Sequence, residues 1–287
     1  MAFGAFGRAL RGLFAAPQPG SLDERIQLPA HVAYAHAGPR PPADRLEWDL
    51  TIQADPGSVV GEYLALFNGS IDGSQCYLGL QTDVRNPDLG RGVGKGLIFS
   101  TWWSFDAADI HVAPGGFREM GTHEGRFIGV RQSYPWTVGD FRVSLGRAGF
   151  DEIDGKLLDW FELTITPTGP QVPGAGRPVA TGSAELIGAL RFPRRRGDRP
   201  AQVDPGGVAF LEVYGAAATW ADVARWEVDV AAFADGHRIT SGRTEYPSFP
   251  HDQVMPNVNI RYDRERDRVA LSMGVGVERR DPAGPWP

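Results

Sequence analysis

The stretch Leu46-Glu47-Trp48-Asp49-Leu50-Thr51-Ile52-Gln53 decides the fold class. Its apolar residues occupy every second position, and polar residues lie between them. Successive side chains of a β-strand point to opposite faces, so this period of two predicts a strand with one face on a core and the other in water. An amphipathic α-helix would instead repeat every 3.6 residues.

The same alternation returns along the rest of the chain, in residues 141–145, 161–165, 226–230, 258–262 and 269–277. Further strand-like runs lack clean alternation and cover residues 63–67, 77–81, 97–103, 126–131, 184–192 and 208–214. Gly, Pro, Asn and Asp pairs separate nearly all of them. About a dozen short strands with such turns favour an all-β, antiparallel sandwich or barrel.

A single short helix is predicted over residues 219–225, with Thr219 as its N-cap. The predicted core contains twelve large apolar side chains from the strands: Trp48, Leu50, Phe67, Leu80, Ile98, Phe141, Val143, Phe161, Leu163, Phe210, Trp226 and Val228.

Composition excludes several classes of protein. The 287 residues include 37 glycines and 23 prolines, yet 42% are apolar, which supports a packed core and argues against intrinsic disorder, collagen and coiled coil. No apolar run reaches the roughly 18 residues of a membrane-spanning helix. A net charge of −6 gives no general attraction to nucleic acid or anionic membrane. One cysteine, Cys76, excludes an internal disulfide framework and a Cys-based zinc cluster.

The predicted organisation is an N-terminal segment with a Pro-rich linker over residues 1–43, followed by one sandwich domain over residues 44–287. The Pro- and Gly-rich residues 167–178 are interpreted as a long loop of that sandwich, with a domain boundary as the alternative. Arg8 and Arg11 interrupt the apolar residues at the start, so no clean signal peptide is present, and a cytoplasmic or secreted location stays open.

Five pieces of the chain, taken in order, resemble a known domain family. They are residues 63–67, residues 76–81, residues 97–102, residues 123–127 with 134–141, and residues 210–214. The match is to a bacterial domain family of unassigned function, with a Gly-aromatic-Gly-x-Gln strand, an Ile-Phe-Ser-x-Trp strand, a Glu-Gly-x-Gly turn before a Tyr-x-Trp pair, and a late Phe-Leu-Glu strand. The resemblance spans about residues 62–214.

This resemblance implies a concanavalin-like, jelly-roll β-sandwich. Family members are often secreted and sometimes joined to carbohydrate-binding or sugar-cleaving modules. The chain departs from the pattern at Leu78, where the family usually carries an aromatic residue, and at Phe127, which replaces the second glycine of the turn. The resemblance supplies no assigned site, so no catalytic residue carries over from it.

Glu124 is the candidate catalytic residue, because a carboxylate at a strand edge can act as a general acid or base or bind sugar hydroxyls. The alternative is a structural carboxylate that accepts backbone hydrogen bonds in a turn. Hydrolysis of a glycan normally needs a second carboxylate. The candidates are Glu62, Asp83, Glu119, Asp140, Glu212 and Glu245.

Six further residues are candidates for ligand binding, because flat rings stack on the apolar faces of sugars and polar side chains bind their hydroxyls. They are Gln81, Trp102, Trp103, Arg131, Tyr134 and Trp136. Trp102 and Trp103 are neighbours, so on a strand they point to opposite sides and one of them is expected in the core.

No metal site is predicted, since the six histidines show no metal-ligand spacing. Calcium is the one cofactor to consider, through Asp151, Asp154 and Asp159, although Asp-Gly is also ordinary turn chemistry. Arginines at 191, 194–196 and 199 form a basic run, interpreted as a solvated loop with an anion site as the alternative.

The first functional hypothesis is therefore recognition of an oligosaccharide or polysaccharide on one sheet face. The second is an enzyme that cleaves a glycan on the same face, with Glu124 as acid or base. The third is a structural or partner-binding module without a small ligand. Fold analogy alone supports the sugar theme, and a fold does not fix a function.

Overall fold

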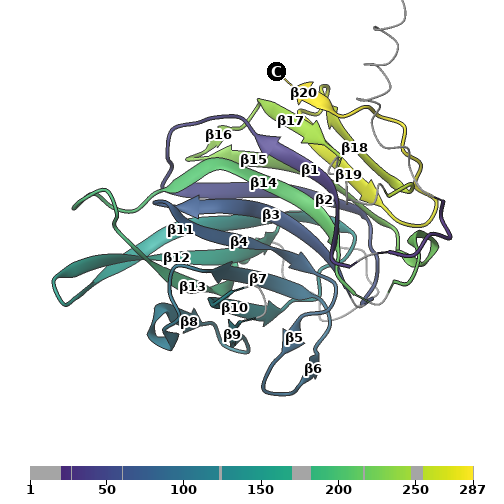
Figure 1. Ribbon diagram of the computed structural model, residues 1–287. Helices are drawn as coiled ribbons and strands as arrows, with labels where there is room; N and C mark the ends of the chain where they lie inside the picture. The colour runs from purple at the N-terminus through teal and green to yellow at the C-terminus, as the bar shows by residue number, and fades with distance from the viewer. Residues whose placement is uncertain are drawn as a thin grey trace, which may run out of the picture.

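The computed structural model describes residues 21–26, 28–59, 61–122, 125–169, 182–215, 217–246 and 255–286. Two large antiparallel sheets face each other, and Figure 1 shows one in front of the other. The described part contains no α-helix, so the protein is an all-β sandwich. It also holds no helix that is long and apolar enough to cross a membrane.

The front sheet, called here the β3 sheet, has the order β20-β17-β1-β14-β3-β4-β7-β10-β9. Its strands are β1 (Ala30–Ala37), β3 (Glu62–Ile71), β4 (Ser74–Gln81), β7 (Gly96–Thr101), β9 (Phe117–Gly121), β10 (Phe127–Ser133), β14 (Val203–Val213), β17 (Gly242–Glu245) and β20 (Gly284–Trp286).

The second sheet, called the β2 sheet, has the order β18-β19-β15-β2-β11-β12-β13-β8, and β16 pairs with β15. Its strands are β2 (Arg45–Ala54), β8 (Ile110–Val112), β11 (Gly139–Ile153), β12 (Lys156–Pro167), β13 (Glu185–Pro193), β15 (Trp226–Ala234), β16 (His237–Arg238), β18 (Val258–Asp263) and β19 (Arg268–Met273). A small hairpin pairs β5 (Arg85–Asn86) with β6 (Arg91–Gly92).

The alternating residues predicted from the sequence build the interface between the sheets. In β2, Leu46, Trp48, Leu50 and Ile52 are all buried. Rings from the two sheets meet there: the centroids of Trp48 and Phe67 lie 6.0 Å apart, and those of Phe99 and Phe192 lie 6.0 Å apart. All twelve predicted core residues are buried, which confirms that prediction. Ile98 and Phe210, however, belong to a second apolar cluster outside the main core.

The structure differs from the sequence prediction at residues 30–37. The sequence placed them in a segment and linker before the sandwich, but they form β1, which pairs with β14 and β17. The buried positions of β1 hold alanines, Ala30, Ala33 and Ala35, together with Val32 at a bulge, so the strand lacks the regular alternation of large apolar residues that marks β2.

Strands from both sides of residues 167–178 pair directly with one another: β14 lies between β1 and β3, and β13 pairs with β12. Most of this stretch lies outside the described residues. The predicted helix at residues 219–225 is a single 3-10 turn, η2 (Trp220–Asp222), and η1 (Ala107–Asp109) is a second one. Beyond the turn, Val223 is extended and the Ala224 N–H donates to the Glu62 carboxylate instead of continuing a helix.

Replacing Trp226 with alanine is expected to lower the free energy of unfolding by about 3–5 kcal/mol. The Trp226 indole is fully buried and stacks on Trp136 with centroids 5.1 Å apart, so its removal leaves a large void. Urea unfolding followed by circular dichroism measures the change. Val275→Ala is the control, because Val275 is 58% exposed and its loss should change stability by less than about 0.5 kcal/mol. Equal stability of the two variants would contradict this packing.

Candidate functional site

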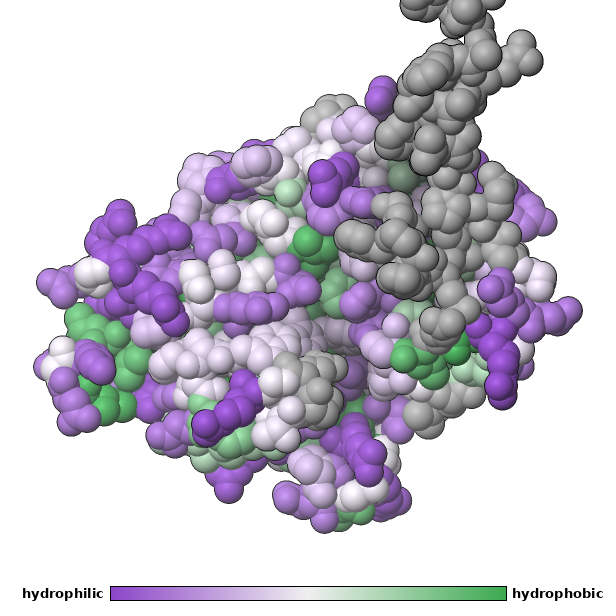
Figure 2. Space-filling view, viewed as in Figure 1, coloured by the Kyte–Doolittle hydropathy of each residue, from purple (hydrophilic) through white to green (hydrophobic). Residues whose placement is uncertain are grey.

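The outer face of the β3 sheet carries the candidate site. Because Leu64, Leu78 and Leu211 point into the core, their neighbours along β3, β4 and β14 point outward. These outward residues form the second apolar cluster, with Tyr63, Phe117 and Phe210 among its buried members. Figure 2 views this side of the molecule, which is pale in the middle and strongly hydrophilic to the left.

Six rings form an unbroken row across the strands, called here the aromatic row: Trp102, Tyr77, Tyr63, Phe210, Tyr34 and His31. The ring centroids lie 5.1 Å apart for Trp102 and Tyr77, 5.9 Å for Tyr77 and Tyr63, and 6.0 Å for Tyr63 and Phe210. Phe210 then contacts His31 at 4.7 Å and Tyr34 at 6.1 Å. The row therefore crosses β4, β3, β14 and β1 and begins just after β7.

A buried polar group lies beside this row. Arg131 projects from β10, and its Nη1 donates to Gln81 Oε1 on β4 at 3.0 Å. Its Nη2 forms an ion pair with the carboxylate of Glu119 on β9. Across the row, His31 Nε2 lies 3.8 Å from Glu212 Oε1. We call Gln81, Glu119, Arg131 and Glu212 the polar cluster.

The hydroxyls of Tyr63 and Tyr214 stay protonated at neutral pH. Burial raises the pKa of Tyr63 well above its usual value, Tyr77 and Glu212 raise it further, and Arg131 opposes them. Burial also raises the pKa of Tyr214. The Tyr63 hydroxyl is buried and has no hydrogen-bond partner among the described residues. A neutral, buried hydroxyl next to Arg131 and Glu212 is unsuited to the role of a nucleophile.

Small residues form the sheet surface between the rings. In register, Ala65 pairs with Gly79 and Ser100 pairs with Gly129, all at outward positions. Gly79 tolerates no side chain, because a Cβ there would lie 2.0 Å from Leu64 O. The rings of Tyr63 and Tyr77 meet above this pair, so the shape of the face comes from the rings and not from the positions beneath them.

The structure brings three of the six predicted ligand-binding residues together here. Gln81 and Arg131 are in direct contact, and Trp102 starts the aromatic row. Trp103 turns the other way: it packs against the main core, and its Nε1 donates to Arg191 O at 2.6 Å. One tryptophan of the pair thus faces the core, as predicted.

Tyr134 and Trp136 lie between the sheets instead of on the outer face. Both are fully buried, and they pack on Phe141 and Trp226, respectively. They flank Pro135 in an extended segment that turns into the core, and the sequence alone did not distinguish this segment from a surface loop. We therefore leave both out of the candidate site. Glu124, the predicted catalytic residue, lies outside the described residues.

Sequence reasoning missed several residues of this face. Tyr63, Tyr34, His31 and Tyr214 were not singled out, and Phe210 was assigned to the core. In β3 the signal is blurred because a bulge between Ala65 and Phe67 interrupts the alternation. In β1 the inward alanines are too small to mark the apolar alternation of a strand. Glu119 and Glu212 were considered only as second carboxylates for catalysis.

The other candidate carboxylates are distributed over the molecule. Glu62 is buried, and its Oε1 accepts a hydrogen bond from Ala224 N at 2.8 Å. Asp140 lies in β11 of the opposite sheet and accepts from Thr51 Oγ1 at 2.7 Å. Neither shares the outer face with Arg131. Burial also raises the pKa of the Cys76 thiol, so that thiol is no nucleophile at neutral pH.

The aspartates considered for calcium bind arginines. Asp151 lies 2.9 Å from Arg191 Nη1, and the fully buried Asp159 lies 2.8 Å from Arg194 Nε. Asp154 has a positive φ of 49° in the turn between β11 and β12, which is turn chemistry. Within the described ranges, no group of three or more His, Cys, Asp or Glu side chains could hold a metal ion.

Several arginines of the basic run form ion pairs with carboxylates of the same protein. Besides Arg191 and Arg194, Arg196 lies 3.0 Å from the carboxylate of Asp72 on the β3–β4 turn. These arginines join the β13–β14 loop to neighbouring strands. The sequence interpretation of a solvated loop is therefore wrong for Arg191 and Arg194, whose side chains are 8% and 9% exposed, and it holds for Arg196, which is 44% exposed.

The sequence matches no protein-family model, and no curated protein is significantly similar to it.

Stability is expected to depend on pH through Glu62. Burial raises its pKa from 4.5 to about 7, so the folded state favours the protonated form. The stability that the fold gains from protonated Glu62 is fully present below about pH 4.5, and it is lost as the pH rises through 7. The loss amounts to about 2–3 kcal/mol.

The Glu62→Gln variant tests this dependence, because its neutral amide can still accept from Ala224 N. Urea unfolding at pH 4.5, 6 and 8 should show the wild type losing stability relative to the variant as the pH rises. Other titrating groups cancel in that difference. A difference that stays constant over this pH range would contradict the assignment.

Proposed function

We propose that the protein binds a linear glycan on the outer face of the β3 sheet, and that its sandwich is of the concanavalin-like, jelly-roll type. The observation that carries the binding proposal is the unbroken aromatic row from Trp102 to Tyr34 and His31. Aromatic rings offer large contact area with few rotatable bonds, and sugars present apolar faces of similar size to them.

The polar cluster supports the same ligand class. Arg131 and Gln81 supply fixed donors, and Glu119 and Glu212 supply acceptors. The partly exposed Tyr34 and Tyr77 add hydroxyl groups. Arg131 is only 7% exposed and is held by two partners, so it is oriented before any ligand arrives. Preorganised polar groups beside stacked rings favour a neutral, hydroxyl-rich ligand over an apolar one.

The row also supports an extended ligand over a single sugar. It spans five neighbouring strands, and adjacent strands lie about 4.8 Å apart, so it extends over roughly 20 Å. The spacing between strands is similar to the length of one pyranose unit in a chain. A glycan lying across the strands would therefore contact the partly exposed rings of Trp102, Tyr77 and Tyr34, and the buried rings of Tyr63 and Phe210 would support them from below.

The binding test is thermal unfolding and calorimetry with a panel of neutral and acidic oligosaccharides in α and β linkage. A ligand at about 100 times its dissociation constant should stabilise the fold by about 2.7 kcal/mol. Tyr77→Ala and Trp102→Ala should each weaken binding about tenfold or more. Phe150→Ala is the matched control, because Phe150 is 58% exposed on the other sheet.

A flat response across the whole panel would overturn the proposal. Equal weakening by Phe150→Ala would show that the effect is not specific to the aromatic row. Chromatography of the glycans after incubation tests the enzyme hypothesis. Shortened products would show that the protein hydrolyses the glycan and would replace the binding proposal.

Chain length gives a further prediction. Affinity should rise from disaccharide to longer oligomers until the aromatic row is filled. Tyr34→Ala, at the β1 end of the row, should then weaken binding of long oligomers several-fold and leave disaccharide binding at the Tyr77 end unchanged. Calorimetry with a size series measures both. An affinity that does not change beyond the disaccharide would indicate a single-sugar site.

A further inference from the structure

An open pocket adjoins the Trp102 end of the aromatic row. It has a volume of about 400 Å³ and is lined by Trp102, Trp103, Ser104, Phe105, Asp106 and Arg126. We call it the Arg126 pocket. It lies where β7 ends and the neighbouring strand β10 begins. Because Trp102 belongs both to the pocket and to the aromatic row, a ligand that follows the row past Trp102 reaches the pocket.

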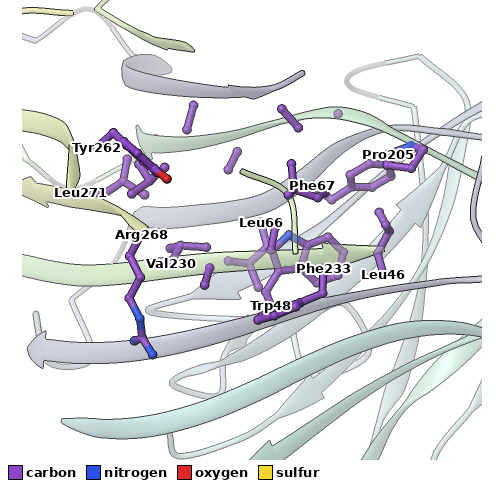
Figure 3. A pocket seen from close by; sticks show the side chains of 18 of the residues that line it. Leu46, Trp48, Leu66, Phe67, Pro205, Val230, Phe233, Tyr262, Arg268 and Leu271 are labelled. Carbon is purple, nitrogen blue, oxygen red and sulfur yellow. The ribbon is translucent and has the colours of Figure 1, made fainter. Parts of the chain in front are cut away.

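The space between the two sheets is too small for such a ligand. Figure 3 shows Trp48, Phe67 and Val230 converging on it from both sheets. Its volume of about 60 Å³ is well below the about 150 Å³ of a cavity that takes benzene, so no sugar ring enters it. The Arg126 pocket is larger than such a cavity and opens to solvent.

Arg126 supplies a positive charge to its pocket. The side chain is exposed, and its Cζ lies over the Phe105 ring, 4.3 Å from the centroid. This cation–π contact orients the guanidinium before a ligand arrives. Among the described residues, no carboxylate pairs with Arg126 and no group accepts a hydrogen bond from its side chain. Its N–H groups are therefore available to an anionic ligand.

The chain on both sides of Arg126 holds it close to Trp102. Phe127 is buried, and its ring centroid lies 6.1 Å from that of Trp102. Gly125 has a φ of 90°, and a Cβ at this residue would lie 3.7 Å from Trp102 Cδ1. The cation and the exposed part of the indole ring are thus parts of one site.

The other charges near this end of the row are already engaged. Arg131 forms an ion pair with Glu119, so it offers a ligand no uncompensated charge. Asp106 also lines the Arg126 pocket, but its Oδ1 accepts from Ala108 N at 2.9 Å and so caps η1. Selection for a negatively charged ligand is therefore expected at Arg126 and not at the centre of the row.

We propose that the Arg126 pocket binds a uronic acid unit of the glycan, with Trp102 against the sugar ring and Arg126 paired with the carboxylate. This inference rests on the proposed glycan binding and narrows its ligand to an acidic glycan. A guanidinium can donate two parallel hydrogen bonds to a carboxylate, so it recognises both the charge and the orientation of the acid. The adjacent indole offers a surface to the apolar face of the same sugar.

The experiment is calorimetry on the full chain with three acidic hexasaccharides, made of mannuronate, of galacturonate, and of alternating glucuronate and N-acetylglucosamine. Each is compared with its carboxyl-reduced form, in which a hydroxymethyl group replaces every carboxylate and the linkages are unchanged. The acidic form should bind about fivefold or more tightly than its reduced form at about 20 mM salt. This preference should shrink at about 500 mM salt, because the pair is exposed to solvent.

Three variants locate the effect. Arg126→Gln should bind the acidic and reduced forms equally. Arg118→Gln is the matched control and should keep the preference, because Arg118 is exposed on β9 and lies outside the pocket. Asp106→Asn should raise the affinity for the acidic form about twofold or more, because it removes a like charge while asparagine still caps η1.

Equal binding of the acidic and reduced forms by the wild type would overturn the inference and leave the proposed function standing. So would a preference that persists in Arg126→Gln, or a panel in which neutral oligosaccharides bind and the acidic ones do not. If no oligosaccharide binds, acidic or neutral, the proposed function fails and this inference fails with it.

Discussion

The alternation of side chains along the β3 sheet is the constraint on which the rest of the structure depends. Each strand commits every second residue to the core, so its remaining residues must form the outer face. Leu64 and Leu78 fix the inner face, and Tyr63 and Tyr77 consequently meet outside. The packing that stabilises the sandwich and the aromatic row on its outer face thus follow from one pattern.

The sequence predicted the fold class well because that pattern is local. In β2 the period of two continues through the whole strand, and every predicted inward residue is buried. The prediction failed where the pattern is carried by small residues. In β1 the buried positions hold alanines and one valine at a bulge, so the strand is recognised only by its pairing with residues of β14 and β17 that lie more than 170 positions later in the chain.

The candidate site was only partly predictable for a related reason. Gln81, Arg131 and Trp102 were found because their residue types suggest ligand binding. Their assembly depends on register between strands, which no single segment encodes: Arg131 on β10 reaches Gln81 across β7. Tyr134 resembled these residues in type but lies in a chain segment that turns inward.

The same alternation links the two faces of β1 and β14. Along β14, Ala209 lies on the inner face and the next residue, Phe210, belongs to the aromatic row. Along β1, Ala35 and Tyr34 stand in the same relation. One backbone therefore carries both the inward alanine and the outward ring, so a larger side chain at Ala35 or Ala209 would press on the opposite sheet and displace the ring that follows or precedes it. The small size of the inward residues is thus part of what positions the rings on the outer face.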